Sequence, residues 1–201
     1  MKNQSLLLSR RALAILALGT LSAASALAQA PAPATATPPA APGTATTAPA
    51  EKPKPLSVNE KKFVKDTGKS LYYQIQLTTA AKTALTDEKL VKLRDTANKD
   101  LNKAWDELSK FAQARGETLP VELVGADKSD VERLGKLKED KFVKQWIEFL
   151  NKEAKHLDKD FEQAGKSAQD TDLKTYIQNY GPSIRSLFTS SEAAEKGLKK
   201  K

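Results

Sequence analysis

One tetrapeptide in the chain has the spacing of a metal-binding motif. Glu153-Ala154-Lys155-His156 is a Glu-x-x-His sequence, and helical di-iron proteins use two such motifs with two further carboxylates. The chain has only this one histidine, so a second motif is impossible. At about 100° per residue, Glu153 lies roughly 60° from the middle of the stripe that Leu150 and Leu157 define, and His156 about 120°. We expect Glu153 at the stripe edge and His156 in solvent. We predict no metal site, with Asp100, Glu153 and His156 as the only candidate ligands.

Two tripeptides resemble the end of a phosphate-binding loop. Gly68-Lys69-Ser70 and Gly165-Lys166-Ser167 have its closing residues, but the motif also needs an earlier glycine on a turn that follows a strand. Phe63 and Asp160 occupy the earlier positions. A Ser-His-Asp triad would have to use His156, and the sequence has no Gly-x-Ser-x-Gly elbow. We predict no catalytic residue, no cofactor and no enzymatic activity.

Composition excludes further classes of site. The chain has no cysteine, which rules out disulfides, thiolate metal sites, thiol nucleophiles and lipid attachment to a cysteine. Its formal charge is +8, and Lys2, Arg10 and Arg11 contribute three of these charges, so the rest of the chain carries +5. The remaining positive residues are mainly lysines interleaved with acids, a pattern that does not favour nucleic acid as a partner.

The N-terminus has the pattern of an export signal. Basic residues precede an apolar run from Ala12 to about Leu27, which ends in Ala26-Leu27-Ala28, a small-x-small cleavage site. We predict a signal peptide over residues 1–28, cleavage after Ala28 and a periplasmic location. Ser9-Arg10-Arg11 leaves open whether the signal is of the general or the twin-arginine type. Retention of the segment as an uncleaved anchor is the alternative.

Residues 29–55 have a biased composition. Ala30 to Pro55 holds eight of the ten prolines and is otherwise almost entirely Ala and Thr. Proline prevents helix formation, and the small residues bury little surface, so we predict a disordered, extended linker. After cleavage it would be a free N-terminal tail. It would act as a tether only if the signal is retained or if a partner grips its prolines.

The remaining residues, 56–201, predict helices. Ser57-Val58-Asn59-Glu60 matches a capping box, which predicts a helix from there to about Lys82. Further helices are expected from about 87 to before Gly116, over 129–138, over 141–164 and from about 170, the last kinked but unbroken at Gly181-Pro182. Apolar residues recur every three or four positions in the four long segments: Phe63, Leu71 and Ile75; Leu90, Leu93, Ala97, Leu101, Ala104, Leu108 and Phe111; Val143, Trp146, Ile147, Leu150, Ala154, Leu157, Phe161 and Ala164; Leu173, Ile177, Tyr180, Ile184, Leu187 and Ala194.

No window alternates in the manner of a strand, so the predicted fold is all-α. Four long helices, each with a single apolar stripe, predict an antiparallel four-helix bundle with one short extra helix. The 146 residues from Leu56 to Lys201 are enough for an ordinary single domain with a core of its own.

The segment from about Phe63 to Phe188 resembles a bacterial family of exported, ferritin-like helical bundles, domain of unknown function 4142. The resemblance rests on packing and turn residues: Phe63-Val64-Lys65, Glu107-Leu108, Phe111-Ala112, Gly116, Leu119-Pro120, Lys141-Phe142, Trp146, and Leu173-Lys174 before Pro182. Members often carry Asp-His pairs in two helices and a histidine in the last. The matching positions here are Asp100-Leu101, Glu153-Ala154 and Leu187, so the family's candidate ligands are replaced by apolar residues.

These observations lead to two hypotheses. The first is a non-catalytic, exported helical module of the cell envelope that binds an envelope protein or wall polymer or has a structural role. The alternative is a ferritin-like metal or redox protein that uses carboxylates alone. Weak contact with an anionic surface is expected from the C-terminal lysines, Lys196, Lys199, Lys200 and Lys201.

Overall fold

The computed structural model describes residues 54–200, all of whose regular structure is helical. Its five helices are α1 (Val58–Ala80), α2 (Glu88–Ala114), α3 (Gly125–Leu134), α4 (Glu139–Ser167) and α5 (Thr171–Leu198). The all-α prediction is therefore confirmed for this part of the chain. The predicted signal peptide and nearly all of the predicted linker lie outside the described residues. None of the helices in the described range is both long and apolar enough to cross a membrane.

Side-chain caps begin three of the long helices. At α1 the predicted capping box is present, since the Ser57 side chain accepts from the amide of Glu60 and the Glu60 carboxylate accepts from the amide of Ser57. The side chains of Asp87 and Asp170 cap α2 and α5 by accepting from backbone amides in the first turn of each helix. Gly116, just past the end of α2, has φ +71°, a conformation that only glycine adopts at little cost.

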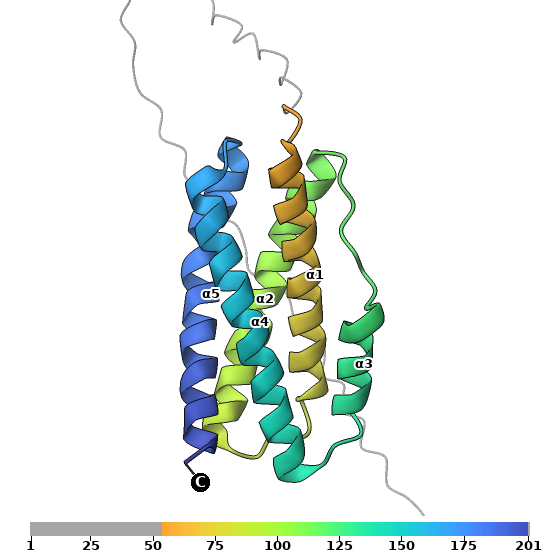
Figure 1. Ribbon diagram of the computed structural model, residues 1–201, viewed down its shortest axis with the longest axis vertical. Coiled ribbons are helices and arrows are strands. Elements are labelled where there is room, and N and C mark those ends of the chain that lie inside the picture. The colour runs from red at the N-terminus through yellow and green to blue at the C-terminus, as the bar shows by residue number, and fades with distance from the viewer. Residues whose placement is uncertain (1–53, 201) are drawn as a thin grey trace, which may run out of the picture. The chain divides into compact units, whose positions relative to one another are not determined.

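Four helices pack in a ring (Figure 1). The neighbouring pairs are α1 with α2, α2 with α5, α5 with α4, and α4 with α1. Each of these pairs is antiparallel. The chain from α2 to α4 crosses the length of the bundle, and on the way α3 packs against both α1 and α4. A fifth helix thus covers part of the seam between α1 and α4, whereas no helix covers the seam between α2 and α5 in the described residues.

Lysines of α1 hold the crossover segment in place. Lys61 and Lys65 both pair with Glu117, at 3.0 and 3.1 Å, and Lys69 pairs with Asp127 at 3.1 Å. Below them Gly68 lies so close to Leu119 that a Cβ on the glycine would come within 2.9 Å of the leucine side chain. The tripeptide Gly68-Lys69-Ser70 thus lies inside α1, where the glycine packs against Leu119 and the lysine pairs with Asp127 of α3. It does not form the loop that a phosphate-binding motif needs.

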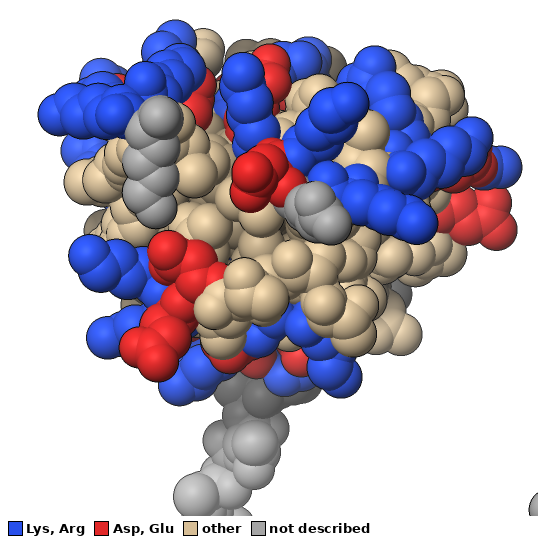
Figure 2. Space-filling model, turned by 90° about the horizontal axis from the view of Figure 1, so that it is seen from below, with Lys and Arg blue, Asp and Glu red and all other residues tan. Residues whose placement is uncertain are grey.

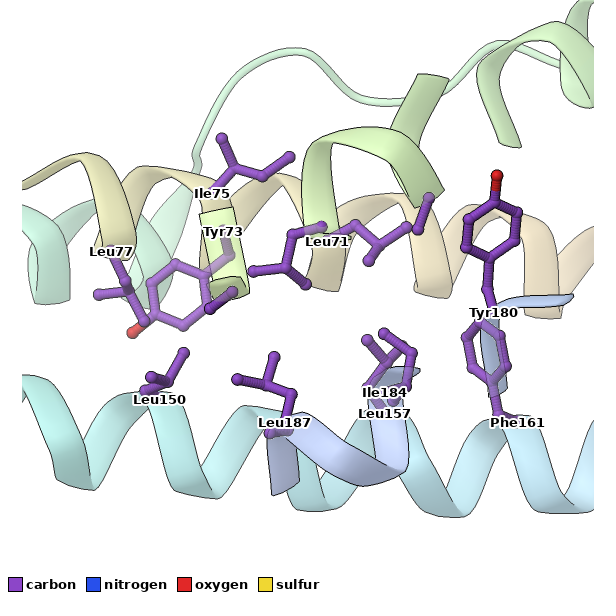
Figure 3. Packing of buried hydrophobic residues seen from close by; sticks show 14 of the residues in the cluster. Leu71, Tyr73, Ile75, Leu77, Leu150, Leu157, Phe161, Tyr180, Ile184 and Leu187 are labelled. Atoms are coloured by element: carbon purple, nitrogen blue, oxygen red, sulfur yellow. The ribbon is translucent and has the colours of Figure 1, made fainter. Parts of the chain in front are cut away.

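The predicted apolar stripes meet in one core (Figure 3). Leu101, Leu150 and Leu157 have no exposed surface. The positions that match the family's histidines are all buried: Leu101 and Ala154 are fully enclosed and Leu187 is 8% exposed. The apolar replacements at these positions are core residues.

Several helix boundaries and core residues differ from the predicted ones. The short helix covers Gly125–Leu134 rather than 129–138, because the hydroxyl of Ser129 bonds back to the carbonyl of Gly125 within the helix instead of capping it, and buried Leu134 fixes the helix end. The first helix ends at Ala80, and the fourth extends over Glu139–Ser167. Phe142 is buried, whereas the predicted core residue Val143 is only half-buried. The reason is that α3 packs on α4, so α4 has buried residues on a second side as well as on the side that faces the bundle core.

Candidate functional site

A long groove follows the uncovered seam between α2 and α5. Its volume is about 960 Å³, and it is lined by the first half of α2, residues 87–101, and the second half of α5, residues 183–198. The two helices remain in contact along the seam. A volume of this size lies at the upper end of the range of roughly 300–1,000 Å³ typical of small-ligand sites.

Apolar side chains form most of the groove surface. Leu90 and Leu187 are each 8% exposed, and Leu93, Ala194 and Leu198 are half-buried. All but Leu198 belong to the stripes that the sequence assigned to the core. The apolar stripes of α2 and α5 therefore extend beyond the enclosed core and onto the wall of the groove.

The groove exists because the solvent-facing residues of α5 that line it are small. The groove-lining residues of α5 include Ser186, Ser190 and Gly197. A Cβ added at Gly197 would meet no atom within 4 Å. Side chains this short leave the space beside the leucines of α2 empty.

The ends of the groove differ in charge. Lys89 and Lys92 line the end where α2 begins, and neither belongs to an ion pair within residues 54–200. Of the two acids there, Asp87 accepts from the amides of Lys89 and Leu90 and so caps the helix, which leaves Glu88. Figure 2 looks onto this end of the bundle, where Lys and Arg side chains dominate the rim. The opposite end is lined by half-buried Asp100 and by Ser183.

The predicted candidate ligands lie at separate places. Asp100 lines the α2–α5 groove, whereas the Glu153 carboxylate accepts from Ser70 of α1 at 3.4 Å. His156 is 70% exposed and pairs with Asp160 at 3.1 Å, in a second, more polar groove of about 760 Å³ between α1 and α4. Within residues 54–200, no three His, Cys, Asp or Glu side chains are placed to hold a metal ion together.

Glu153 is nevertheless in an unusual environment. Its partner Ser70 accepts in turn from the amide of Gln74, which is fully buried. Burial raises the pKa of Glu153 above its usual value, against the opposing effects of Lys152 and His156. Such a carboxyl group is held closer to its neutral form than a surface glutamate.

The second phosphate-loop lookalike is also helical. Gly165, Lys166 and Ser167 are the last residues of α4. Lys166 pairs with Glu162 at 2.9 Å, and the hydroxyl of Ser167 donates to the carbonyl of Gln163. The side chains of Lys166 and Ser167 thus bond within their own helix.

Sequence reasoning did not find the groove, although one signal for it was present. Small residues recur at helical spacing beside the apolar stripe of the last helix, at positions 183, 186, 190, 193 and 197. Such a pattern fits a close helix–helix contact as well as an open groove. The choice depends on how far α2 diverges from α5, which no local pattern records.

The fold and the groove define an all-helical bundle with an apolar groove on one seam. Residues 45–193 match the protein family described as Domain of unknown function (DUF4142). The chain belongs to this family, which confirms the resemblance drawn from its packing residues.

The fold is also similar to that of a solved structure, titled "Crystal structure of DUF305 fragment from Deinococcus radiodurans". The TM-score is 0.62 at 10% sequence identity, over 71% of this chain and 99% of that one. At this identity the similarity extends to the helical fold alone. A search of curated proteins finds no match.

Proposed function

We propose that the protein is an exported, non-catalytic binding module of the bacterial cell envelope, built on a ferritin-like bundle. It holds an apolar part of a partner in the groove between α2 and α5. The observation that carries this proposal is the groove itself, a space of about 960 Å³ lined by leucines of two helices. The predicted signal peptide supports export to the periplasm, and the single long crossover is the connectivity of ferritin-like bundles.

The C-terminal lysines contribute less than their number implies. Lys196 pairs with Glu192 at 3.1 Å and Lys199 with Glu195 at 2.5 Å. These pairs neutralise part of the basic end, and Lys201 lies outside the described residues. Contact with wall polymer or another anionic surface through this end is therefore a minor part of the proposal.

Site-specific crosslinking in cells tests the proposed function. A photoreactive residue in place of Ser190, which is exposed and lines the groove, is expected to form an adduct in cells that carry the native gene. The same residue in place of Lys144, which is exposed on α4 and does not line the groove, is the control and is expected to form none. Intact mass detects lipid-sized and protein-sized adducts alike. Equal labelling at the two positions, or none at Ser190, would contradict the proposal.

The alternative function, carboxylate-only metal or redox chemistry, is favoured by one observation, the buried carboxyl group of Glu153 with its raised pKa. We expect the purified protein to bind no stoichiometric iron or manganese, because Asp100 and Glu153 lie on different seams. The measurement is bound metal by elemental analysis, together with the melting temperature with and without metal. Stoichiometric metal that is lost on Glu153→Gln would establish the alternative.

The same Glu153→Gln variant also has a predicted effect without metal. A carboxyl group whose pKa is raised in the folded state destabilises the fold as pH rises through that range. The neutral amide is therefore expected to melt above the unchanged protein at about pH 7 and to lose this advantage toward about pH 4.

A further inference from the structure

The shape of the α2–α5 groove restricts what can occupy it, which bears on the function proposed above. Its lining residues at the start of α2 span positions 87–101, so at about 1.5 Å per residue the groove is roughly 20 Å long. Because α2 and α5 still contact each other, the space is a channel along a closed seam and not the gap left by a missing helix. A slender occupant fits such a channel better than a whole helix does.

The chemistry of the walls is that of a hydrocarbon site. Leu90, Leu93 and Leu187 form the inner surface, and the outer side of α5 presents hydroxyls and the open space beside Gly197. Within the groove, Asp100 at one end is the only ionisable side chain besides those at the entrance of α2. A flexible alkyl chain needs no hydrogen-bond partners and can change its conformation to fit an irregular apolar surface.

The entrance adds a charge preference. Lys89 and Lys92 line it without ion-pair partners in the described part of the chain, while the carboxylate of Asp87 is engaged in capping α2. An anionic headgroup at this end would lie beside the two ammonium groups and away from Asp100. For a cationic headgroup the same end offers the carboxylates of Glu88 and Asp87, and two backbone amides already engage the carboxylate of Asp87.

From the groove's length, its apolar walls and the two lysines at its entrance, we propose that its occupant is a fatty acid. The alkyl chain lies along the leucines of α2 and α5, and the carboxylate lies at Lys89 and Lys92. This inference rests on the proposed function of the groove and names the class of ligand that the groove binds.

Calorimetric titration of the delipidated full protein with dodecanoate, kept below its micelle concentration, tests the proposal. We expect one molecule per chain with a micromolar dissociation constant. Dodecyltrimethylammonium, which has the same alkyl chain and the opposite charge, is expected to bind about tenfold more weakly or worse. Equal binding of the two amphiphiles would overturn the assignment of the headgroup site.

Variants locate the site. The double substitution Lys89→Gln, Lys92→Gln is expected to weaken dodecanoate binding about tenfold, and Lys144→Gln, at an exposed lysine away from the groove, is the control. Ser186→Leu with Ser190→Leu fills the groove from exposed positions of α5, so the fold is retained and binding is expected to be lost. Thr189→Leu, exposed on the same helix but not lining the groove, is expected to leave binding unchanged. Unaltered binding by the filled groove would refute the proposal.

The titration and the crosslinking experiment together distinguish a failure of the fatty-acid proposal from a failure of the proposed function. If dodecanoate does not bind but the Ser190 crosslinker captures a protein-sized adduct, the fatty acid is wrong and the binding groove stands. A lipid-sized adduct with dodecanoate binding supports both. No binding together with no adduct refutes both.

Discussion

Glu60→Gln is expected to lower the free energy of unfolding by about 3 kcal/mol near pH 7. Glu60 is 7% exposed, and its carboxylate bonds two helix starts at once. One oxygen accepts from the amide and hydroxyl of Ser57, at 2.9 and 2.7 Å, and the other from the amides of Gln169 and Asp170, both at 2.8 Å. A glutamine would turn its NH₂ group toward one of these sets of donors.

The pH dependence gives the sign of this effect. Burial alone would raise the pKa of Glu60, but the hydrogen bonds from Asp170, Ser57 and Gln169 outweigh it and lower the pKa from 4.5 to about 2. The contribution is therefore complete above about pH 4.5 and is lost as the pH falls toward 2. The difference between the unchanged protein and the variant should shrink over the same interval.

Urea denaturation at a series of pH values measures this prediction. Glu162→Gln is the matched control, since Glu162 is an exposed glutamate paired with a lysine one turn away. It should have no comparable effect at any pH. Identical unfolding curves for Glu60→Gln and the unchanged protein near neutral pH would show that the four hydrogen bonds do not stabilise the fold.

Leu101→His is expected to destabilise the fold by about 3 kcal/mol near pH 7 and by more near pH 5. Leu101 has no exposed surface and follows Asp100, so the substitution recreates an Asp-His pair at the position where the family resemblance places one. The imidazole would replace a well-packed leucine, and its protonation would bury a charge. Thermal melts at the two pH values, with Leu101→Met as the volume-conserving control, measure the effect.

Adding metal to the Leu101→His variant tests the alternative function, a metal-binding protein. We expect manganese or iron to leave the melting temperature of Leu101→His unchanged, because residues 54–200 place no cluster of further ligands around any one point. A metal-dependent recovery of stability would show that the scaffold still holds the geometry of a metal centre, and would favour the carboxylate-based alternative.

Much of the fold follows from local sequence signals. The capping box at Ser57 and Glu60 and the glycine just past the second helix, Gly116, have the predicted role, and the second helix begins next to the predicted position. Each works through neighbours within a few residues, so the sequence is sufficient to assign it. The displaced short helix shows the limit, because its ends depend on the burial of Leu134 and on a bond from Ser129 that competes with capping.

The groove could not be predicted in this way. Leu90, Leu93 and Leu187 have the same spacing as the enclosed leucines of the stripes, and their sequence neighbours do not reveal which residues face a second helix. Likewise, the hydrogen bonds that the Glu60 carboxylate accepts from the amides of Gln169 and Asp170 join residues that are 109 and 110 positions apart. Contacts of that range depend on the assembled ring and not on a local pattern.

The ring consists of two helical hairpins, α1–α2 and α4–α5, each closed by a short turn. Contacts within a hairpin are local and can form early in folding, whereas the two seams that join the hairpins close later. Since α3 packs across the seam between α1 and α4, we expect the α2–α5 seam to open at a lower free energy than the α1–α4 seam. Transient separation of the hairpins along it would let an alkyl chain enter sideways, so the rate of ligand uptake would be set by the breathing of the bundle.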